Sequence, residues 1–484
     1  PAIMEPGGTL PAEAEEEMMM EDVILDDGTF QVVEFDEDEP VPEDEDDEVS
    51  EPGEDAVEDL QEQIQGMDVA QEVFDDLSLV TLDGHSDSVY SVAGCRMDGG
   101  ELRVVTGGGD DVAMLWSISP SLGDAPPAAG GAASAEQPPP PPAPTQAPRQ
   151  LEATKLATLE GHADSVVSVG FSHDGSLFAT ASMDGVIKVW SSDDGKLVRT
   201  LEGPGDVEWL QWHGKGNVLL AGSSDGTVWM WLASSGACMQ VFAGHEGAVT
   251  SGIFTPDGRT VVTGGADGTV RLWAPKKGSC KHVFQGHGFH EGAVTCLAAH
   301  PKWDSGTSAA DGSSDSSNHL IMSGSEDGYA KLLHLGSKRI VASFAHSPGI
   351  SQEGTVDEEA GEGFSVEDVD LCGVQPWAAT GGVDGFCKVW DISSGRLRHS
   401  LQIPEGVAVV KLRWHPSQAL IVTASADGVV RLWDARQGLM AKELTGHRNM
   451  LLDLQPLWGR DGDGEEGDLV LSSSDDQTAK VFRL

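Results

Sequence analysis

The chain has 484 residues and is strongly acidic, with 80 Asp and Glu against 29 Lys and Arg and a formal net charge of −51. Nucleic acids and anionic membranes would repel such a chain, because both are bound through clusters of Lys and Arg. The six cysteines form no Cys-x-x-Cys pair, and there is no signal peptide or long apolar run. These features indicate a reducing intracellular compartment, with the cytoplasm first and the nucleus second.

The first 76 residues carry much of this charge, with 30 Asp and Glu and no Lys or Arg. A segment with so many like charges cannot bury a core, so we predict that residues 1–76 form a mostly disordered acidic tail. Apolar residues gather in two islands, at 23–35 and 57–67. The first island is either a short docking motif or residual hydrophobicity, and the second has approximate helical spacing.

Residues 77–82 form a short apolar run that precedes the first of a series of repeats. The last repeat ends at Leu484, just after its third expected strand. We therefore expect residues 77–82 to supply the missing outer strand of the last repeat. This pairing would close the ring and remove an exposed sheet edge.

An aspartate then recurs eight times, each time six residues before an aromatic or large apolar residue, and Gly follows it in six of the eight units. The pairs are Asp110 with Trp116, Asp184 with Trp190, Asp225 with Trp231, Asp267 with Trp273, Asp327 with Leu333, Asp384 with Trp390, Asp427 with Trp433, and Asp476 with Phe482. An apolar run precedes each aspartate. Each unit is therefore predicted to contain a strand, a tight turn and another strand.

A histidine begins most of the units, four residues before an apolar residue of the first expected strand. These histidines are His85, His162, His245, His290 and His447. In the fifth unit His290 has this spacing and His287 does not. The sixth unit offers only His346, and the third and seventh units have none.

Four stretches without strand character interrupt the repeats, at 117–150, 302–318, 347–363 and 459–467. Without them, residues 77–484 give about 41 residues per unit, the span of a four-stranded propeller blade. We predict an all-β fold, a single eight-bladed β-propeller over residues 77–484.

The repeat resembles the WD-repeat β-propeller family, whose signature dipeptide stands complete at Trp390-Asp391 and Trp433-Asp434. The resemblance implies that His, a Ser or Thr of the second strand, the turn Asp and Trp form a buried hydrogen-bonded chain. In the second blade these residues would be His162, Thr180 or Ser182, Asp184 and Trp190. The repeated residues are thus expected to be structural. They comprise His85, His162, His245, His290, His447, Trp190, Trp231, Trp273, Trp390, Trp433 and the eight turn aspartates.

The sequence offers no recognisable catalytic site. It has no Gly-Lys-Ser/Thr phosphate loop, Gly-x-Ser-x-Gly elbow or His-Glu-x-x-His helix. The acidic stretch that begins at Asp461 lacks the spacing of a calcium loop. We therefore expect a non-enzymatic protein without a cofactor or metal ion.

In the family, the loops that enter the first strands and the Asp-Gly turns share one rim, usually the ligand-binding face. Here that rim would gather nine acids: Asp87, Asp164, Asp206, Glu208, Glu246, Glu291, Glu326, Glu405 and Asp475. A basic polypeptide is the complementary ligand, since each partly desolvated charge-assisted pair contributes roughly 1.5–3 kcal/mol. The alternative is that these acids serve solubility alone.

A closer resemblance lies in the third unit, at 205–213 and 218–231, and in the segments 171–175, 428–436 and 474–482. These segments resemble the family of the angio-associated migratory cell protein and its fungal relatives. The resemblance implies a chaperone that captures the basic N-terminal segment of large-subunit ribosomal protein ten and delivers it to the large subunit. We accordingly expect a monomer, with pre-ribosomal particles as further partners and no direct contact with nucleic acid or membrane.

Two other binding functions stay open. A histone chaperone would share the acidic tail and the basic client. The sequence from Trp433 to Arg436, Trp-Asp-Ala-Arg, matches the box of propellers that serve as substrate receptors of cullin ubiquitin ligases.

Overall fold

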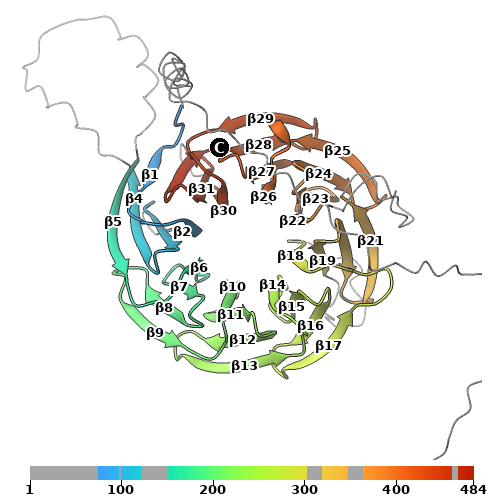
Figure 1. The fold of residues 1–484 in the computed structure, drawn as a ribbon, viewed down its shortest axis with the longest axis horizontal. Coiled ribbons are helices and arrows are strands. Elements are labelled where there is room, and N and C mark those ends of the chain that lie inside the picture. Colours follow the sequence, from blue (N-terminus) through green and yellow to red (C-terminus); the bar gives the residue numbers. More distant parts are fainter. Residues whose placement is uncertain (1–74, 98–99, 121–150, 302–318, 347–363, 460–466) are drawn as a thin grey trace, which may run out of the picture. The chain divides into compact units, whose positions relative to one another are not determined.

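The computed structural model describes residues 75–97, 100–120, 151–301, 319–346, 364–459 and 467–484. In this part of the chain, eight four-stranded antiparallel sheets stand around a central channel (Figure 1). The prediction of an all-β, eight-bladed propeller is confirmed. Except for Asp75 and Asp76, the predicted acidic tail lies outside the described residues, as do 302–318 and 347–363.

Each blade runs from an inner strand at the channel to an outer strand at the circumference. Blades 1 to 4 comprise β2 (Val89–Arg96), β3 (Leu102–Gly108), β4 (Ala113–Pro120), β5 (Leu151–Leu159); β6 (Val166–Phe171), β7 (Leu177–Ser182), β8 (Ile187–Ser191), β9 (Leu197–Leu201); β10 (Val207–Trp212), β11 (Val218–Ser223), β12 (Thr227–Leu232), β13 (Ala237–Ala243); β14 (Val249–Phe254), β15 (Val261–Gly265), β16 (Val270–Ala274) and β17 (Ser279–Phe284).

Blades 5 to 8 repeat this order, and a short 3-10 helix, η1 (Pro404–Gly406), lies between blades 6 and 7. Their strands are β18 (Val294–Ala299), β19 (Leu320–Ser325), β20 (Tyr329–His334), β21 (Arg339–Ala345); β22 (Val366–Leu371), β23 (Trp377–Gly382), β24 (Phe386–Asp391), β25 (Arg396–Gln402); β26 (Val409–Trp414), β27 (Leu420–Ser425), β28 (Val430–Asp434), β29 (Leu439–Leu444); β30 (Leu451–Leu457), β31 (Leu469–Ser474), β32 (Ala479–Arg483) and β1 (Val80–Leu82).

The recurring Asp-Gly pair is explained by the turn between the second and third strands. Asp184 Oδ1 accepts a hydrogen bond from Val186 N at 2.8 Å, and Gly185 has a φ of 77°. A positive φ favours Gly because it has no Cβ. In the two units without this Gly, Asp111 and Gln477 hold the same position with φ of 65° and 69°.

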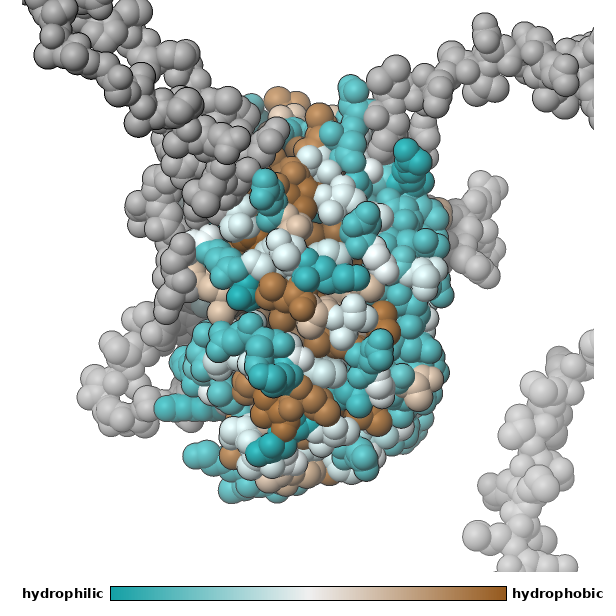
Figure 2. Space-filling view, turned by 90° about the vertical axis from the view of Figure 1, so that its left-hand side faces the viewer, coloured by the Kyte–Doolittle hydropathy of each residue, from teal (hydrophilic) through white to brown (hydrophobic). Residues whose placement is uncertain are grey.

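The core lies between neighbouring blades. Ala179 and Val189 of blade 2, for example, pack in one cluster with Leu219, Ala221 and Trp231 of blade 3. A single blade cannot cover both faces of its own sheet, so the stacked ring forms a continuous core. On the outer wall, apolar patches interrupt the polar surface on the side shown in Figure 2.

Residues near both ends of the propeller meet in blade 8, where β1 pairs antiparallel with β32. Val80 lies opposite Val481, and Leu82 opposite Ala479. Two residues assigned to the tail also contact this blade: Thr445 Oγ1 donates to Asp75 O at 2.6 Å, and Lys480 Nζ to Asp76 Oδ2 at 2.6 Å. The ordered connection to the ring thus includes Asp75 and Asp76.

The expected insertion at 117–150 starts too early. Strand β4 continues to Pro120 and pairs with Leu151–Leu159 on its outer side. Ile118 explains the extension, because it is buried in the core and lies opposite both Leu102 and Ala153. Residues 117–120 therefore belong to a strand, and the stretch that follows, 121–150, lies outside the described residues.

Side chains from one blade satisfy the channel-facing edge of the next inner strand. Asp453 Oδ2 accepts from Val92 N at 3.1 Å, Asp368 Oδ2 from Leu412 N at 2.8 Å, and Gln211 Oε1 from Phe254 N at 2.7 Å. Inner strands have no neighbour across the channel, so these bonds replace missing ladder partners. No helix in the described part of the chain is long and apolar enough to cross a membrane.

Candidate functional site

Two sets of loops form one rim, which we call the upper rim: the loops that enter the inner strands and the turns between second and third strands. In every blade the N–H before the turn aspartate donates to the carbonyl before the inner strand, at 2.8–3.1 Å. The pairs are Gly109 with Ser88, Met183 with Ser165, Ser224 with Asp206, Ala266 with Ala248, Glu326 with Ala293, Val383 with Ser365, Ala426 with Ala408, and Asp475 with Met450.

Below this rim, a His and the turn Asp are paired in six blades. In blade 4, His245 Nδ1 lies 3.0 Å from Asp267 Oδ1, His245 Nε2 lies 2.8 Å from Thr263 Oγ1, and Trp273 Nε1 donates to Thr263 at 2.8 Å. The remaining pairs are His85 with Asp110, His162 with Asp184, His290 with Asp327, His346 with Asp384, and His447 with Asp476.

Blade 2 distinguishes between the two hydroxyls left open by the sequence. Thr180 Oγ1 lies 2.8 Å from His162 Nε2 and accepts from Trp190 Nε1 at 3.0 Å. Ser182 Oγ instead donates to Asp164 O at 2.8 Å and accepts from Asp184 N at 3.1 Å. Thr180 therefore belongs to the buried chain, and Ser182 connects the turn to the entering loop.

The electrostatics of these pairs suit a structural role. Burial lowers the pKa of His162 and outweighs the opposite effect of Asp184. Burial alone would raise the pKa of Asp184, but hydrogen bonds from Ala163 N and Val186 N and the neighbouring His162 lower it overall. The Asp184 carboxylate thus stays ionised, and its hydrogen bonds hold the blade together.

The two blades without a His differ from each other near the turn. In blade 3 a Cβ at Gly203 would lie 2.5 Å from Trp229 Cζ3, so the indole packs against Gly203, and it also stacks on Trp231. In blade 7 the Arg431 side chain donates to Asp427 Oδ2 at 2.6 Å and to Ser425 Oγ at 2.7 Å. Arg431 is buried and also pairs with Glu443.

The acids predicted to bind a partner lie on the upper rim, but at several repeat positions. Glu246 and Glu291 directly follow the landmark His, while Asp87 and Asp164 come one residue later. The others occupy the start of blade 3 (Asp206, Glu208), η1 (Glu405) and the turns of blades 5 and 8 (Glu326, Asp475). Setting Glu405 aside, none of these carboxylates forms an ion pair with another described residue.

Two of these acids have distinctive surroundings. Burial and the nearby Asp206 both raise the pKa of Glu208, so a cation placed there would relieve a repulsion. Asp475 is half-buried, accepts from Ser88 Oγ of blade 1, and lies 2.5 Å from Asn449 Nδ2. Asp475 thus also connects blades 8 and 1.

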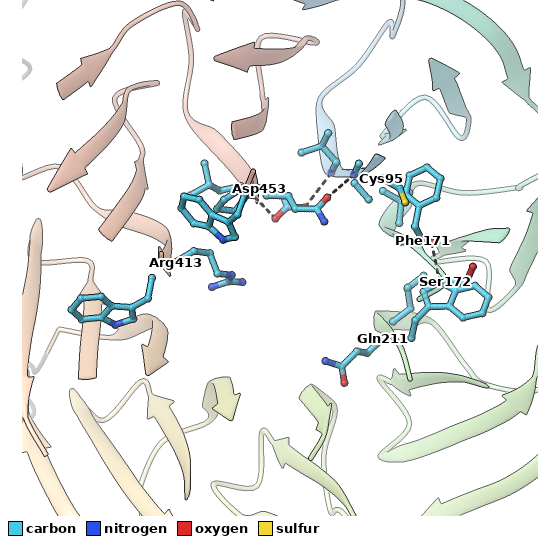
Figure 3. A pocket seen from close by; sticks show the side chains of 18 residues that line it. Cys95, Phe171, Ser172, Gln211, Arg413 and Asp453 are labelled. Atoms are coloured by element: carbon cyan, nitrogen blue, oxygen red, sulfur yellow. Dashed lines mark hydrogen bonds between the residues drawn. The ribbon is translucent and has the colours of Figure 1, made fainter. Parts of the chain in front are cut away.

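Sequence reasoning did not identify the cavity of about 570 Å³ in the central channel, shown in Figure 3. Arg413, Gln211 and Asp453 line it, with Phe171 and Cys95. Its charged groups are engaged in the ring: Arg413 Nη1 donates to Asp368 Oδ2 at 2.5 Å and to Leu412 O at 2.6 Å. The described residues hold no group of three or more potential metal ligands.

Comparison with protein families gives a match to the WD domain, G-beta repeat, at residues 77–117, 153–191, 195–231, 236–274, 359–391 and 395–434. The matches leave out most of blades 5 and 8, although both have the same four strands. WD-repeat propellers are in general non-enzymatic scaffolds, and no catalytic family is indicated.

Among curated proteins, the human angio-associated migratory cell protein is 35% identical over 407 residues, which cover 84% of this chain and 80% of that protein. The dog protein of the same name matches to the same extent.

Solved structures show the same fold. Sqt1 of Saccharomyces cerevisiae superposes with a TM-score of 0.66 at 21% identity, covering 84% of this chain and 99% of Sqt1. Sqt1 of Chaetomium thermophilum, solved bound to the N-terminus of ribosomal protein L10, gives a TM-score of 0.63 at 20% identity, covering 85% and 100%.

Proposed function

Because the chain belongs to the WD-repeat family of the angio-associated migratory cell protein, we propose that it is a binding protein that chaperones a basic ribosomal protein. Its client is the N-terminal segment of newly made ribosomal protein L10, held on the upper rim and delivered to the large ribosomal subunit. The observation that carries this proposal is the gathering, on one face of the ring, of carboxylates that are mostly exposed and form no ion pair with another described residue.

Charge supports the choice of client. A chain with a net charge of −51 repels RNA at long range and attracts basic segments. The fold it shares with Sqt1, which was solved with the L10 N-terminus, makes the same client the first candidate. Capture and release would be electrostatic, since ribosomal RNA can compete for the same Lys and Arg side chains.

The rim geometry supports direct contact with the client. Glu246 and Glu291 are exposed, and each is anchored through its backbone N–H to a turn aspartate at 3.1 Å. The backbone of each acid is therefore held in place before the client arrives, which lowers the entropic cost of binding. The protein would act as a monomer in the cytoplasm, and also in the nucleus if it follows the client onto pre-ribosomal particles.

The test is a pull-down from cell extract at low and moderate salt, with the full chain as bait. We expect ribosomal protein L10 in the eluate, less of it at moderate salt, and a marked loss with the triple variant Glu208→Lys, Glu246→Lys and Glu291→Lys. The melting temperature of the variant should match that of the unaltered protein. Recovery of histones or a ubiquitin-ligase adaptor without any ribosomal protein would overturn the proposal.

A further inference from the structure

Three consecutive blades of the upper rim expose large apolar side chains. Tyr90 of blade 1 is 39% exposed, Met183 of blade 2 is 45% exposed, and Met450 of blade 8 is 36% exposed. These blades are neighbours in the closed ring, where blade 8 lies beside blade 1 (Figure 1). We call these three residues the apolar arc. Single exposed apolar residues are ordinary, but a group on adjacent blades of one rim suggests a contact surface.

Contacts connect the members of the apolar arc to the rim. Asp475 N donates to Met450 O at 3.1 Å, and the Asp475 carboxylate accepts from Ser88 Oγ, two residues before Tyr90. A Cβ at Gly109 would lie 3.1 Å from Tyr90 Cε2, so the Tyr90 ring lies close to that turn. Gly109 holds the turn position that Met183 holds in blade 2. In blades 1 and 2, a large apolar side chain therefore lies at the same part of the rim, next to the exposed acids Asp87 and Asp164.

Blades 3 to 5 hold five of the nine rim acids, and their described residues expose no large apolar side chain on the upper rim. Blades 3 to 5 carry what we call the acidic arc: Asp206, Glu208, Glu246, Glu291 and Glu326. The residues before the turn aspartates of blades 3 and 4 are Ser224 and Ala266, which are small. In blade 8, exposed Arg448 holds the repeat position of Glu246 and Glu291. Basic groups of a client are thus favoured over blades 3 to 5 and disfavoured beside Arg448.

We propose that the client segment is amphipathic and lies across the channel mouth in one direction. Its Lys and Arg residues contact the acidic arc, and its apolar residues pack on the apolar arc. This inference rests on the proposed function, and it adds the features by which the rim would select its client. Methionine side chains adapt to irregular partners, and tyrosine adds apolar area with few rotatable bonds. Basic polypeptides without apolar residues would satisfy only half of the rim.

The test measures binding of a synthetic peptide, the L10 N-terminal segment, to the full chain over a series of salt concentrations. The variant Tyr90→Ser, Met183→Ser, Met450→Ser should bind about tenfold more weakly. The slope of affinity against salt should stay unchanged, because no charge is lost. A peptide whose apolar residues are replaced by Ser should bind the variant and the unaltered protein equally.

Matched controls lie on the outer wall and on the same rim. Met239→Ser, Leu397→Ser and Leu439→Ser replace exposed apolar residues of three outer strands, and should change affinity by less than about twofold. Val383→Ser replaces the blade 6 counterpart of Met183, exposed on the other side of the channel, and should do the same.

This inference would be overturned if the apolar-arc variant and the unaltered protein bound the peptide equally. If the Glu208→Lys, Glu246→Lys, Glu291→Lys variant still bound the peptide more weakly, the proposed function would stay intact. If Val383→Ser reduced peptide affinity as much as the apolar-arc variant, the proposed direction of the client segment across the channel mouth would be wrong. A change in oligomeric state of the apolar-arc variant, without a change in peptide affinity, would assign the surface to self-association. Failure of the unaltered protein to bind the peptide would remove both proposals.

Discussion

Glu326 and Asp327 are adjacent in the turn between β19 and β20, but their carboxylates lie in different surroundings. Asp327 Oδ2 lies 3.0 Å from His290 Nδ1 and accepts from Glu291 N at 3.1 Å, and its Oδ1 accepts from Tyr329 N at 2.9 Å. The Glu326 side chain is exposed on the upper rim. The repeat uses one carboxylate to hold the turn, which leaves its neighbour available to a partner. Stability and binding should therefore respond to different mutations.

The largest effect is expected from opening the ring on which both carboxylates depend. Replacing residues 77–82 by a Gly-Ser stretch of equal length removes the pairing of β1 with β32 and the burial of Val80 and Leu82. We expect the free energy of unfolding to fall by about 3–6 kcal/mol. Urea denaturation measures this loss, and an unchanged midpoint would rule out closure by this strand.

Single substitutions in one turn test whether Asp327 and Glu326 have different roles. Asp327→Ala leaves buried His290 and two backbone N–H groups without their partner, and should cost about 2–4 kcal/mol. Glu326→Ala should stay within about 0.5 kcal/mol. Thermal melts of the two variants side by side give the answer. Similar losses would mean that position in the turn does not separate the two roles.

The pH dependence of stability should distinguish the two carboxylates in the same way. Burial would raise the pKa of Asp327, but its hydrogen bonds and His290 hold it below the ordinary 3.8. The unfolded state therefore takes up a proton first as the pH falls, so this contribution is complete above about pH 4 and lost below it. Urea melts at about pH 5 and pH 3 measure how much stability the protein loses on acidification, and Asp327→Asn should make this loss smaller. If Glu326→Gln reduced the loss as much, the assignment would be wrong.

The repeat made most of the fold predictable, because one polar chain recurs in fixed register. The blade number could be derived from the aspartates alone, and His290 has the geometry that its spacing indicated. The replacement of the missing His in blade 7 was not predictable. Arg431 reaches the turn aspartate Asp427 from the third strand, a contact that only the three-dimensional packing shows.

The candidate site was predictable to a lesser degree. The resemblance indicated that the acids share a rim, and the loops that carry most of them are joined by the same backbone bond in every blade. These acids occupy several repeat positions, so no single position of the repeat identifies them. The apolar arc was missed because Tyr90, Met183 and Met450 are far apart in sequence and hold three different repeat positions.

The central claim, that the upper rim binds a basic client, is tested most directly by charge reversal on opposite faces of the ring. Glu246→Lys with Glu291→Lys changes two rim acids, while Asp193→Lys with Asp194→Lys changes two exposed acids in the turn between β8 and β9, on the other face. Titration of the L10 N-terminal peptide should show a loss of about tenfold or more for the first pair and less than about threefold for the second. Equal losses would mean that overall charge, and not the upper rim, attracts the client.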